Sequence, residues 1–410
     1  ATFLSGTMMA AWDGSTKTAP SAGDGSEGNP YQIKTEENLA WLANTSDEWG
    51  KHFIQTANLD MGNHQLDQPI GNSTTKFTGS YNGDGYVISN LYYNDNTQSN
   101  VGLFGYISGA ELTKITIASG SVYGSGAVGG ICGAAYATST ISYCANNATV
   151  YGKKEQIGGV CGYLEKSTVT NCINYGLVSG FNFVGGVVGR CKSNNSNVIT
   201  NCINVGQIFS MCATSGNIIG FNDNFTSTRE NNYYDNQLNT LIGVTGYKNI
   251  IDPIADETGV AGLSTTNIIG KKLQDAFGSE ATNWVFTEGL YPRINGSHNH
   301  SAIILAATPV TLESGDKADN VTTNFKVSTE NGVSWESGES ANLKISGKSA
   351  TILKNTGVAI IASKDGFSKK IFLKTNKPNA THIGSETAPL TIETEKDLKD
   401  LREAVNTYGT

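Results

Sequence analysis

The segment Val101-Gly102-Leu103-Phe104-Gly105 is the first copy of a glycine-bounded element that returns at a regular interval along the chain. The later copies are Gly130-Ile131-Cys132-Gly133, Gly159-Val160-Cys161-Gly162, Gly186-Val187-Val188-Gly189 and the degenerate Asn217-Ile218-Ile219-Gly220. Their last glycines, at positions 105, 133, 162, 189 and 220, lie 28, 29, 27 and 31 residues apart. A period of this size indicates a repeat protein in which similar units stack on one another.

Two further elements follow the glycine-bounded one. The first is a strand-like segment that ends on asparagine, found at 141–146, 169–174 and 199–204. The second is a short strand, seen in Val122-Tyr123-Gly124, Val150-Tyr151-Gly152, Val178-Ser179-Gly180 and Ile208-Phe209-Ser210. None of them has the spacing of about 3.6 residues that marks a helix. We therefore predict an all-β fold, a right-handed parallel β-helix with three strands per coil and coils about 4.8 Å apart.

Stacked coils place equivalent residues in ladders along the axis. The seven cysteines all lie between Cys132 and Cys212, and most of them fall on two such ladders. One ladder contains Phe104, Cys132, Cys161, Val188 and Ile219, and the other contains Ile115, Cys144, Cys172 and Cys202. A free cysteine behaves as a small buried hydrophobe, so we predict buried thiols rather than disulfides or a metal site. A third ladder of Asn146, Asn174 and Asn204 predicts stacked amides at a corner.

Gly102-Leu103-Phe104-Gly105 and its copies resemble the GLUG repeat, a Gly-Leu-any-Gly signature of bacterial cell-surface proteins. The flanking segments 29–42, 77–86 and 231–293 resemble the regions around such repeats, so the resemblance covers roughly residues 10–300. It implies an adhesin or surface lipoprotein of the Bacteroides type, which is extracellular and attached to the outer membrane. Some GLUG regions lie beside a zinc peptidase domain, but this chain contains no H-E-x-x-H motif.

The domain organisation follows from changes in the pattern. We assign residues 1–300 to the β-helix, with repeats at about 98–222, a capping helix at 35–44 and a second helix at 265–277. Residues 301–377 alternate in polarity over six or seven short segments, which predicts an Ig-like β-sandwich. Residues 389–401 repeat the pattern of residues 30–42, so 378–410 is expected to be a linker and the start of a second β-helix-like module.

Composition limits the classes of partner. The net charge is −8 and the pI is near 5.2, which argues against nucleic acid and anionic membranes. No apolar run is long enough for a transmembrane helix, and no export signal remains at the start of the sequence. The 48 glycines have no Gly-X-Y period, which excludes collagen and favours many tight turns. We expect a monomer.

The repeats contain few residues that could act in catalysis. Between residues 98 and 222 the acidic residues are Glu111, Glu155 and Glu165, and no two of them share a ladder position. Polysaccharide hydrolysis needs a close pair of carboxylates, and a lyase would need acids for calcium. The sequence therefore predicts no catalytic residue, no metal and no cofactor. A polysaccharide lyase or hydrolase nevertheless stays the alternative, because many parallel β-helices are such enzymes.

Two columns of residues are candidates for ligand binding. Tyr106, Tyr163, Arg190 and Phe221 follow the closing glycines, and Tyr123, Tyr151 and Phe209 follow inward-facing Val or Ile residues. Repeated aromatic rings offer flat surfaces for sugars or protein partners, although the rings could simply cover one another. The predicted function is that of a non-catalytic adhesin-like protein that binds a host or environmental glycan or a surface protein. A structural spacer in a larger surface protein is a further alternative.

Overall fold

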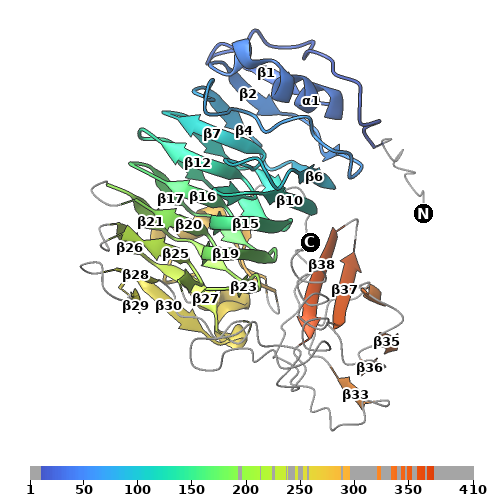
Figure 1. Ribbon diagram of the computed structural model, residues 1–410, viewed down its shortest axis with the longest axis vertical. Helices are drawn as coiled ribbons and strands as arrows, with labels where there is room; N and C mark the ends of the chain where they lie inside the picture. Colours follow the sequence, from blue (N-terminus) through green and yellow to red (C-terminus); the bar gives the residue numbers. More distant parts are fainter. Residues whose placement is uncertain are drawn as a thin grey trace.

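The computed structural model describes residues 11–192, 196–212, 214–223, 227–236, 238, 245–247, 253–255, 258–287 and 290–295. It also describes the strand segments 321–324, 334–338, 343–346, 349–352, 358–364 and 367–373. Most of residues 31–263 form a β-solenoid, in which four parallel sheets lie side by side around one axis (Figure 1). This confirms the predicted all-β solenoid. Its right-handedness stays a prediction.

The coils in the middle of the solenoid contribute a strand to each of the four parallel sheets, whereas the end coils contribute to some of them. Sheet 1 is, in spatial order, β1 (Tyr31–Ile33), β2 (His52–Gln55), β4 (Ser80–Asn82), β8 (Glu111–Thr113), β13 (Thr140–Ser142), β17 (Thr168–Thr170), β21 (Val198–Thr200) and β26 (Thr228–Glu230). Sheet 2 is β3 (Leu59–Asp60), β5 (Val87–Ser89), β9 (Thr116–Ile117), β14 (Ala145–Asn146), β18 (Ile173–Asn174), β22 (Ile203–Asn204), β27 (Asn232–Asp235) and β30 (Val260–Leu263).

Sheets 3 and 4 carry the two predicted aromatic columns. Sheet 3 is β6 (Leu91–Asn94), β10 (Gly120–Gly124), β15 (Thr149–Gly158), β19 (Val178–Gly185) and β23 (Ile208–Ser210), with β11 (Val128–Gly129) on β15 and β24 (Ser215–Gly216) on β19. Sheet 4 is β7 (Phe104–Ser108), β12 (Cys132–Tyr136), β16 (Cys161–Leu164), β20 (Val188–Cys191) and β25 (Ile219–Asn222).

The prediction of three strands per coil was wrong, because the segment that ends on asparagine folds as two strands. Tyr143, Asn171 and Asn201 separate the two strands in successive coils, with φ of 54°, 52° and 54°. A left-handed residue turns the chain sharply, and asparagine adopts this conformation more readily than most residues. The segment therefore bends from sheet 1 into sheet 2, and the coil has four sides.

The interior is a stack of the predicted ladders. Parallel pairing aligns Phe104, Cys132, Cys161, Val188 and Ile219, all of them fully buried. Cys144, Cys172 and Cys202 are buried in the second predicted ladder, and the backbone N–H of Cys144 lies 3.5 Å from the Cys172 sulfur. Cys191 is buried as well, so six of the cysteines act as small core side chains, while Cys212 is half-buried.

The three predicted asparagines form a hydrogen-bonded ladder. The Asn146 amide donates to Asn174 Oδ1 at 2.9 Å, and the Asn174 amide donates to Asn204 Oδ1 at 2.9 Å. Each amide also donates to a backbone carbonyl two residues later, which for Asn174 is that of Gly176 at 2.9 Å. The ladder packs against glycines, since a Cβ on Gly159 would lie 2.3 Å from Asn174 Cγ. Side chains and backbone thus satisfy each other inside the coil.

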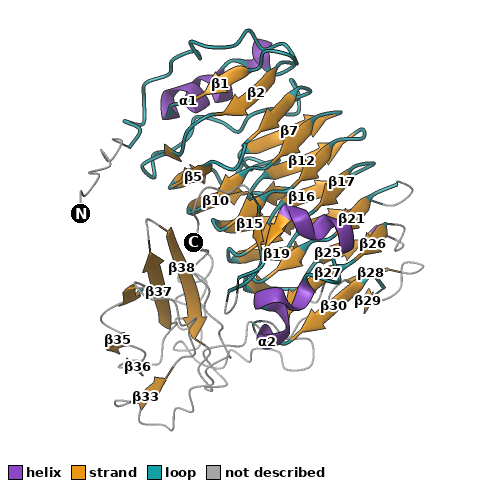
Figure 2. Cartoon of the chain, turned by 180° about the vertical axis from the view of Figure 1, so that it is seen from behind, coloured by secondary structure: helices purple, strands orange, loops and turns teal. Residues whose placement is uncertain are grey.

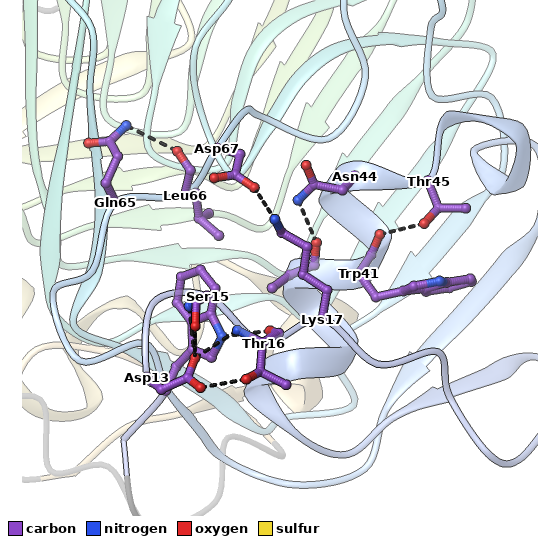
Figure 3. Close-up of polar contacts among 12 residues, drawn as sticks. Asp13, Ser15, Thr16, Lys17, Trp41, Asn44, Thr45, Gln65, Leu66 and Asp67 are labelled. Carbon is purple, nitrogen blue, oxygen red and sulfur yellow. Dashed lines mark hydrogen bonds and ion pairs between the residues drawn. The ribbon is translucent and has the colours of Figure 1, made fainter.

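The N-terminal end of the solenoid is covered by helix α1 (Glu36–Asn44), close to the predicted 35–44, followed by the 3-10 turn η1 (Ser46–Glu48). Thr35 caps α1, because its side chain accepts from the Asn38 backbone N–H while Asn38 Oδ1 accepts from the Thr35 N–H. In Figure 3, Lys17 on the preceding segment reaches Asp67 across the helix, with Nζ and Oδ2 2.5 Å apart. Leu39 and Leu42 of α1 are fully buried on the side of the helix that faces the solenoid core.

After the last coil the chain turns back along sheet 2. This strap, residues 264–295, contains α2 (Thr265–Ile268), η3 (Gly270–Leu273), η4 (Gly278–Asn283), β31 (Trp284–Val285) and β32 (Arg293–Ile294), with its helices lying against the coils in Figure 2. The predicted helix at 265–277 is interrupted, because Ile269 is extended and Gly270 has φ 70°. The strap buries Ile173 and Ile203 of sheet 2 under Phe277 and Trp284.

Polar contacts fix the strap to the coils. Glu280 Oε2 accepts hydrogen bonds from Tyr143 Oη and Asn171 Nδ2, both at 3.2 Å. The Tyr175 hydroxyl donates to the Pro292 carbonyl at 2.6 Å. At the other end of the strap, Asp235 Oδ2 accepts from the Thr265 hydroxyl at 2.6 Å. The chain therefore runs from the last coil back to the middle of the solenoid.

The remaining strands are antiparallel. β28 (Thr245–Tyr247) pairs with β29 (Pro253–Ala255). In the predicted sandwich, β33 (Val321–Asn324), β36 (Ser349–Ile352) and β35 (Leu343–Ser346) form one sheet, and β34 (Ser334–Ser337), β37 (Val358–Lys364) and β38 (Phe367–Leu373) form another. The rest of 301–377 and all of 378–410 lie outside the described residues. Within the described residues, no helix has both the length and the apolar character needed to cross a bilayer.

Candidate binding surfaces

The first predicted column is aligned on sheet 4 but is closed by its own contacts. Parallel pairing places Tyr106, Ala134, Tyr163, Arg190 and Phe221 on neighbouring strands. Tyr163 and Phe221 are buried, with 9% and 4% of their surface exposed. These two side chains therefore present little surface to a ligand, and their predicted role in binding stays a prediction.

Tyr136 contributes to the burial of Tyr163, and the sequence reasoning missed it. Ala134 leaves a gap in the column, and the Tyr136 ring stacks on Tyr106 with centroids 4.6 Å apart and planes 5° apart. On its other side it packs against Tyr163 at 5.3 Å. Lys76 covers Tyr106 at 5.5 Å from the ring centroid. Because the rings stack along the axis, their faces are already used and no flat platform remains for a sugar ring.

Arg190 joins two coils rather than facing solvent. Its Nε and Nη2 donate to Asp223 Oδ1 and Oδ2, each at 3.0 Å, and its guanidinium lies 5.3 Å from the Phe183 ring and 5.7 Å from the Phe221 ring. Burial is the largest single influence and opposes its charge, but the hydrogen bonds and charge of Asp223, together with the charges of Tyr163 and Glu155, raise the pKa of the guanidinium. Arg190 thus has a structural role between two coils, and its predicted role as a ligand contact stays a prediction.

An Arg190→Ala variant is expected to lose about 2–3 kcal/mol of unfolding free energy, because charged hydrogen bonds and two ring contacts disappear together. Lys192→Ala is the matched control, since Lys192 Nζ lies 3.9 Å from the same carboxylate and is 42% exposed. That change should cost less than about 1 kcal/mol. Urea unfolding of both variants measures the difference. Equal small losses would show that Arg190 does not hold the two coils together.

The second predicted column lies on sheet 3 and stays partly open. Tyr123 pairs with Tyr151, Tyr151 with Ser179, and Ser179 with Phe209. All but Ser179 are half-buried. Tyr123 and Tyr151 meet edge to face at 5.9 Å, an arrangement that leaves ring surface outside the contact. Burial raises the pKa of both phenols, so they are neutral hydroxyls at physiological pH.

Two residues that the sequence reasoning missed extend this column. Phe181 is 48% exposed and Met211 is 47% exposed, and they are the exposed large hydrophobic side chains of the described part of the chain. Gly180 pairs with Ser210, so Phe181 and Met211 follow paired positions on adjacent coils. We call Tyr123, Tyr151, Phe181, Phe209 and Met211 the apolar patch. The signal was present in the sequence, because each added residue lies two positions after an outward-facing one.

The acids outside the repeats are engaged in local contacts. Asp60 Oδ1 accepts from the Asn90 amide at 2.8 Å, and Asp95 accepts from the Thr97 backbone and hydroxyl. Asp235 is buried and binds the hydroxyls of Thr265 and Tyr291. These carboxylates cap turns and fix the strap. Among the described residues, no group of three or more His, Cys, Asp or Glu side chains is arranged to hold a metal ion.

One contact has the residue types of a hydrolase. His52 Nδ1 lies 2.8 Å from Ser80 Oγ on neighbouring strands of sheet 1. Pairing then places Glu111 beside Ser80, on the side away from His52. In the described part of the chain no carboxylate hydrogen-bonds the imidazole, although a third group normally orients the base of such a pair. The contact can hold two coils together, but it lacks the third group that orients the imidazole in a catalytic triad.

Known proteins give a similarity in fold and two partial sequence relatives. No protein-family model matches the chain. Halomucin of Haloquadratum walsbyi is 31% identical over 169 residues, 38% of this chain and 2% of that protein. A “Putative Gly-rich membrane protein” of Evansella cellulosilytica is 37% identical over 98 residues, 22% of this chain and 11% of that protein. The chain thus spans only a small part of these curated relatives.

A solved structure, named a “putative immunoglobulin A1 protease” from Bacteroides ovatus, superposes with a TM-score of 0.50 and 19% identity. The superposition covers 68% of this chain and 96% of that chain. At this identity it shows the fold alone. The chain is therefore a β-solenoid related in fold to that protein and similar over limited stretches to a halomucin and a Gly-rich membrane protein.

Proposed function

We propose that this chain is a non-catalytic, adhesin-like binding module of a bacterial cell-surface protein, and that the apolar patch is its binding face. The observation that carries the proposal is the exposure of Phe181 and Met211 beside three half-buried aromatic rings. Exposed apolar side chains that gather in one place, rather than singly, often mark a contact surface for a partner. The ligand is a glycan or a protein on a host or environmental surface.

The extracellular, outer-membrane location is part of this proposal. It is supported by the GLUG resemblance and by relatives named a mucin and a membrane protein. We further propose that the two antiparallel sheets within 321–373 belong to an Ig-like sandwich that presents the solenoid. The enzyme alternative is weakened by the local hydrogen bonds of Asp60, Asp95 and Asp235. The spacer alternative predicts no ligand at any surface.

Binding should be measured with the full chain on a glycan array and on immobilised mucin and extracellular-matrix proteins, with product analysis of polysaccharides in parallel. A Phe181→Ser/Met211→Ser variant should bind at least about tenfold more weakly, a loss of about 1.4 kcal/mol. About half of each residue's surface is exposed, 48% for Phe181 and 47% for Met211, so its unfolding free energy should change by less than about 1 kcal/mol.

The matched control is Thr228→Ser/Glu230→Ser, which alters exposed residues of sheet 1 and should leave binding unchanged. Cleavage of any polysaccharide by the wild-type chain would overturn the non-catalytic assignment. Absence of binding to every probe would favour the spacer. Binding that the patch variant retains in full would place the ligand elsewhere on the solenoid.

A further inference from the structure

We propose that the apolar patch docks an acidic amphipathic segment of a protein partner, with Phe181 and Met211 as apolar anchors and Lys153 and Lys154 meeting the partner's carboxylates. This inference rests on the proposed function and names its class of ligand. It commits to a protein segment. Acidic polysaccharides carry the same negative charge, and the test distinguishes them from a protein segment.

The strand register brings these groups together. Gly152, Gly180 and Ser210 are paired on β15, β19 and β23. A Cβ on Gly152 or Gly180 would meet the Ile157 side chain, so both glycines face the core. The residues that follow them, Lys153 and Phe181, therefore face outward, as does Met211 after Ser210. Phe181 and Met211 lie next to each other in one outward row on adjacent coils, and a β-bulge in β15 between Gly152 and Glu155 sets Lys153 and Lys154 opposite Phe181.

A second outward row lies two residues earlier on the same strands and consists of Tyr151, Ser179 and Phe209. Ser179 is a small residue between two rings, and only 8% of its surface is exposed. The two rows give an apolar surface with a lysine at one end. An exposed phenylalanine and an adaptable methionine are typical anchors for an apolar side of a peptide.

Charge determines which peptide is favoured. Lys153 and Lys154 are both exposed at the N-terminal side of the patch, although the chain as a whole carries −8. The neighbouring Glu155 is half-buried and pairs with Asn182 on the next coil, so one carboxylate stands against the two lysines. Asp95 lies two coils from the lysines, on the coil before Tyr123, and is hydrogen-bonded to Thr97. The edge of the patch is therefore locally positive and attracts carboxylates.

The polar groups at the patch favour a protein over a sugar. A sugar site places several hydrogen-bonding groups beside an aromatic face. Here the Ser210 hydroxyl donates to the Cys212 carbonyl at 3.0 Å, and the Ser179 side chain is buried. The Asn182 Oδ1 accepts a hydrogen bond from the Thr214 hydroxyl. What remains is apolar surface with the hydroxyls of Tyr123 and Tyr151 and a cationic rim, which matches a segment that has an apolar face followed by Asp or Glu.

The test selects peptides from a random phage-displayed library on the immobilised full chain. Enriched sequences should combine aromatic or aliphatic residues with Asp or Glu. A synthetic peptide with the enriched sequence should then bind wild type, lose at least about tenfold on Phe181→Ser/Met211→Ser, and lose a similar factor on Lys153→Glu/Lys154→Glu. Its binding should also weaken as salt is raised, because the lysines are exposed.

Charge reversal gives the decisive control. The same peptide with its acids changed to Lys should bind Lys153→Glu/Lys154→Glu more tightly than wild type. Enrichment of neutral or basic sequences on wild type, or a peptide affinity that none of the four substitutions changes, would overturn the proposal. Binding of hyaluronan or polysialic acid at the patch, without any peptide, would overturn the protein partner yet leave the proposed binding function intact. Only failure of every probe on wild type would remove both.

Discussion

An Asn174→Ala variant is expected to lose about 2–5 kcal/mol of unfolding free energy, a large share of what holds a domain together. The side chain is fully buried and accepts from Asn146 while it donates to Asn204 and to the Gly176 carbonyl. Its removal leaves an Asn146 N–H and the Gly176 carbonyl without these partners, and it also leaves a cavity. Urea unfolding followed by circular dichroism gives the change.

Two further variants separate the possible causes. Asn174→Leu fills much of the same volume but cannot hydrogen-bond, so a similar loss would assign the effect to the unsatisfied amides. Asn96→Ala removes an exposed asparagine in a turn and should change stability by less than about 0.5 kcal/mol. A fully stable Asn174→Leu variant would mean that an apolar ladder replaces the amide ladder and that the hydrogen bonds add no net stability.

Stability is also expected to fall steeply as the pH rises above the ordinary range of thiol ionisation. Burial raises the pKa of the Cys132, Cys172, Cys191 and Cys202 thiols well above the ordinary value. In the unfolded chain these thiols ionise near pH 8.5 or just above. The unfolded state then binds fewer protons than the folded state, so the unfolding free energy decreases with pH. The stabilisation is complete below the unfolded pKa and is lost as the pH approaches the raised folded values.

Each of these thiols should contribute about 1.4 kcal/mol per pH unit between about pH 8.5 and 10. Unfolding midpoints in urea, measured with a reductant across that window, give the slope. Replacing Cys172 with Val keeps a small apolar side chain in the ladder and should reduce the slope by the share of one thiol. A midpoint that stays constant to pH 10 would show that the thiols are not held in an apolar interior.

The ladders could be predicted from the sequence because they depend on one property, the near-constant step between copies. Once coils stack in parallel, the alignment of Cys132 with Cys161 follows from counting. The corner at Asn171 could not be predicted in this way, because asparagine only favours a left-handed φ and the equivalent position of an earlier coil is Tyr143, a residue type that seldom adopts it. Helix 265–277 was overestimated for a related reason, since its break at Ile269 and Gly270 is set by packing on sheet 2.

The candidate site shows the same division. The sequence predicted both columns correctly as rows of aligned residues. It could not predict which row would be closed, because closure depends on a ring from a different position filling the gap over a small residue. Tyr136 fills the gap at Ala134 on sheet 4, while on sheet 3 Phe181 and Met211 remain exposed around Ser179. A small residue in an aromatic column is thus a sign to examine the outward residue two positions later.

The strap has a mechanical consequence. Residues beyond Asn295 are joined to the side of the solenoid, near the coils of Tyr143 and Asn171, and not to its end. Tension applied to the chain after Asn295 reaches the contacts of Tyr175, Trp284 and Glu280 before it reaches the coils. The strap is therefore expected to detach from the coils contact by contact, beginning at its C-terminal end. The parallel ladders carry the load only after it has detached.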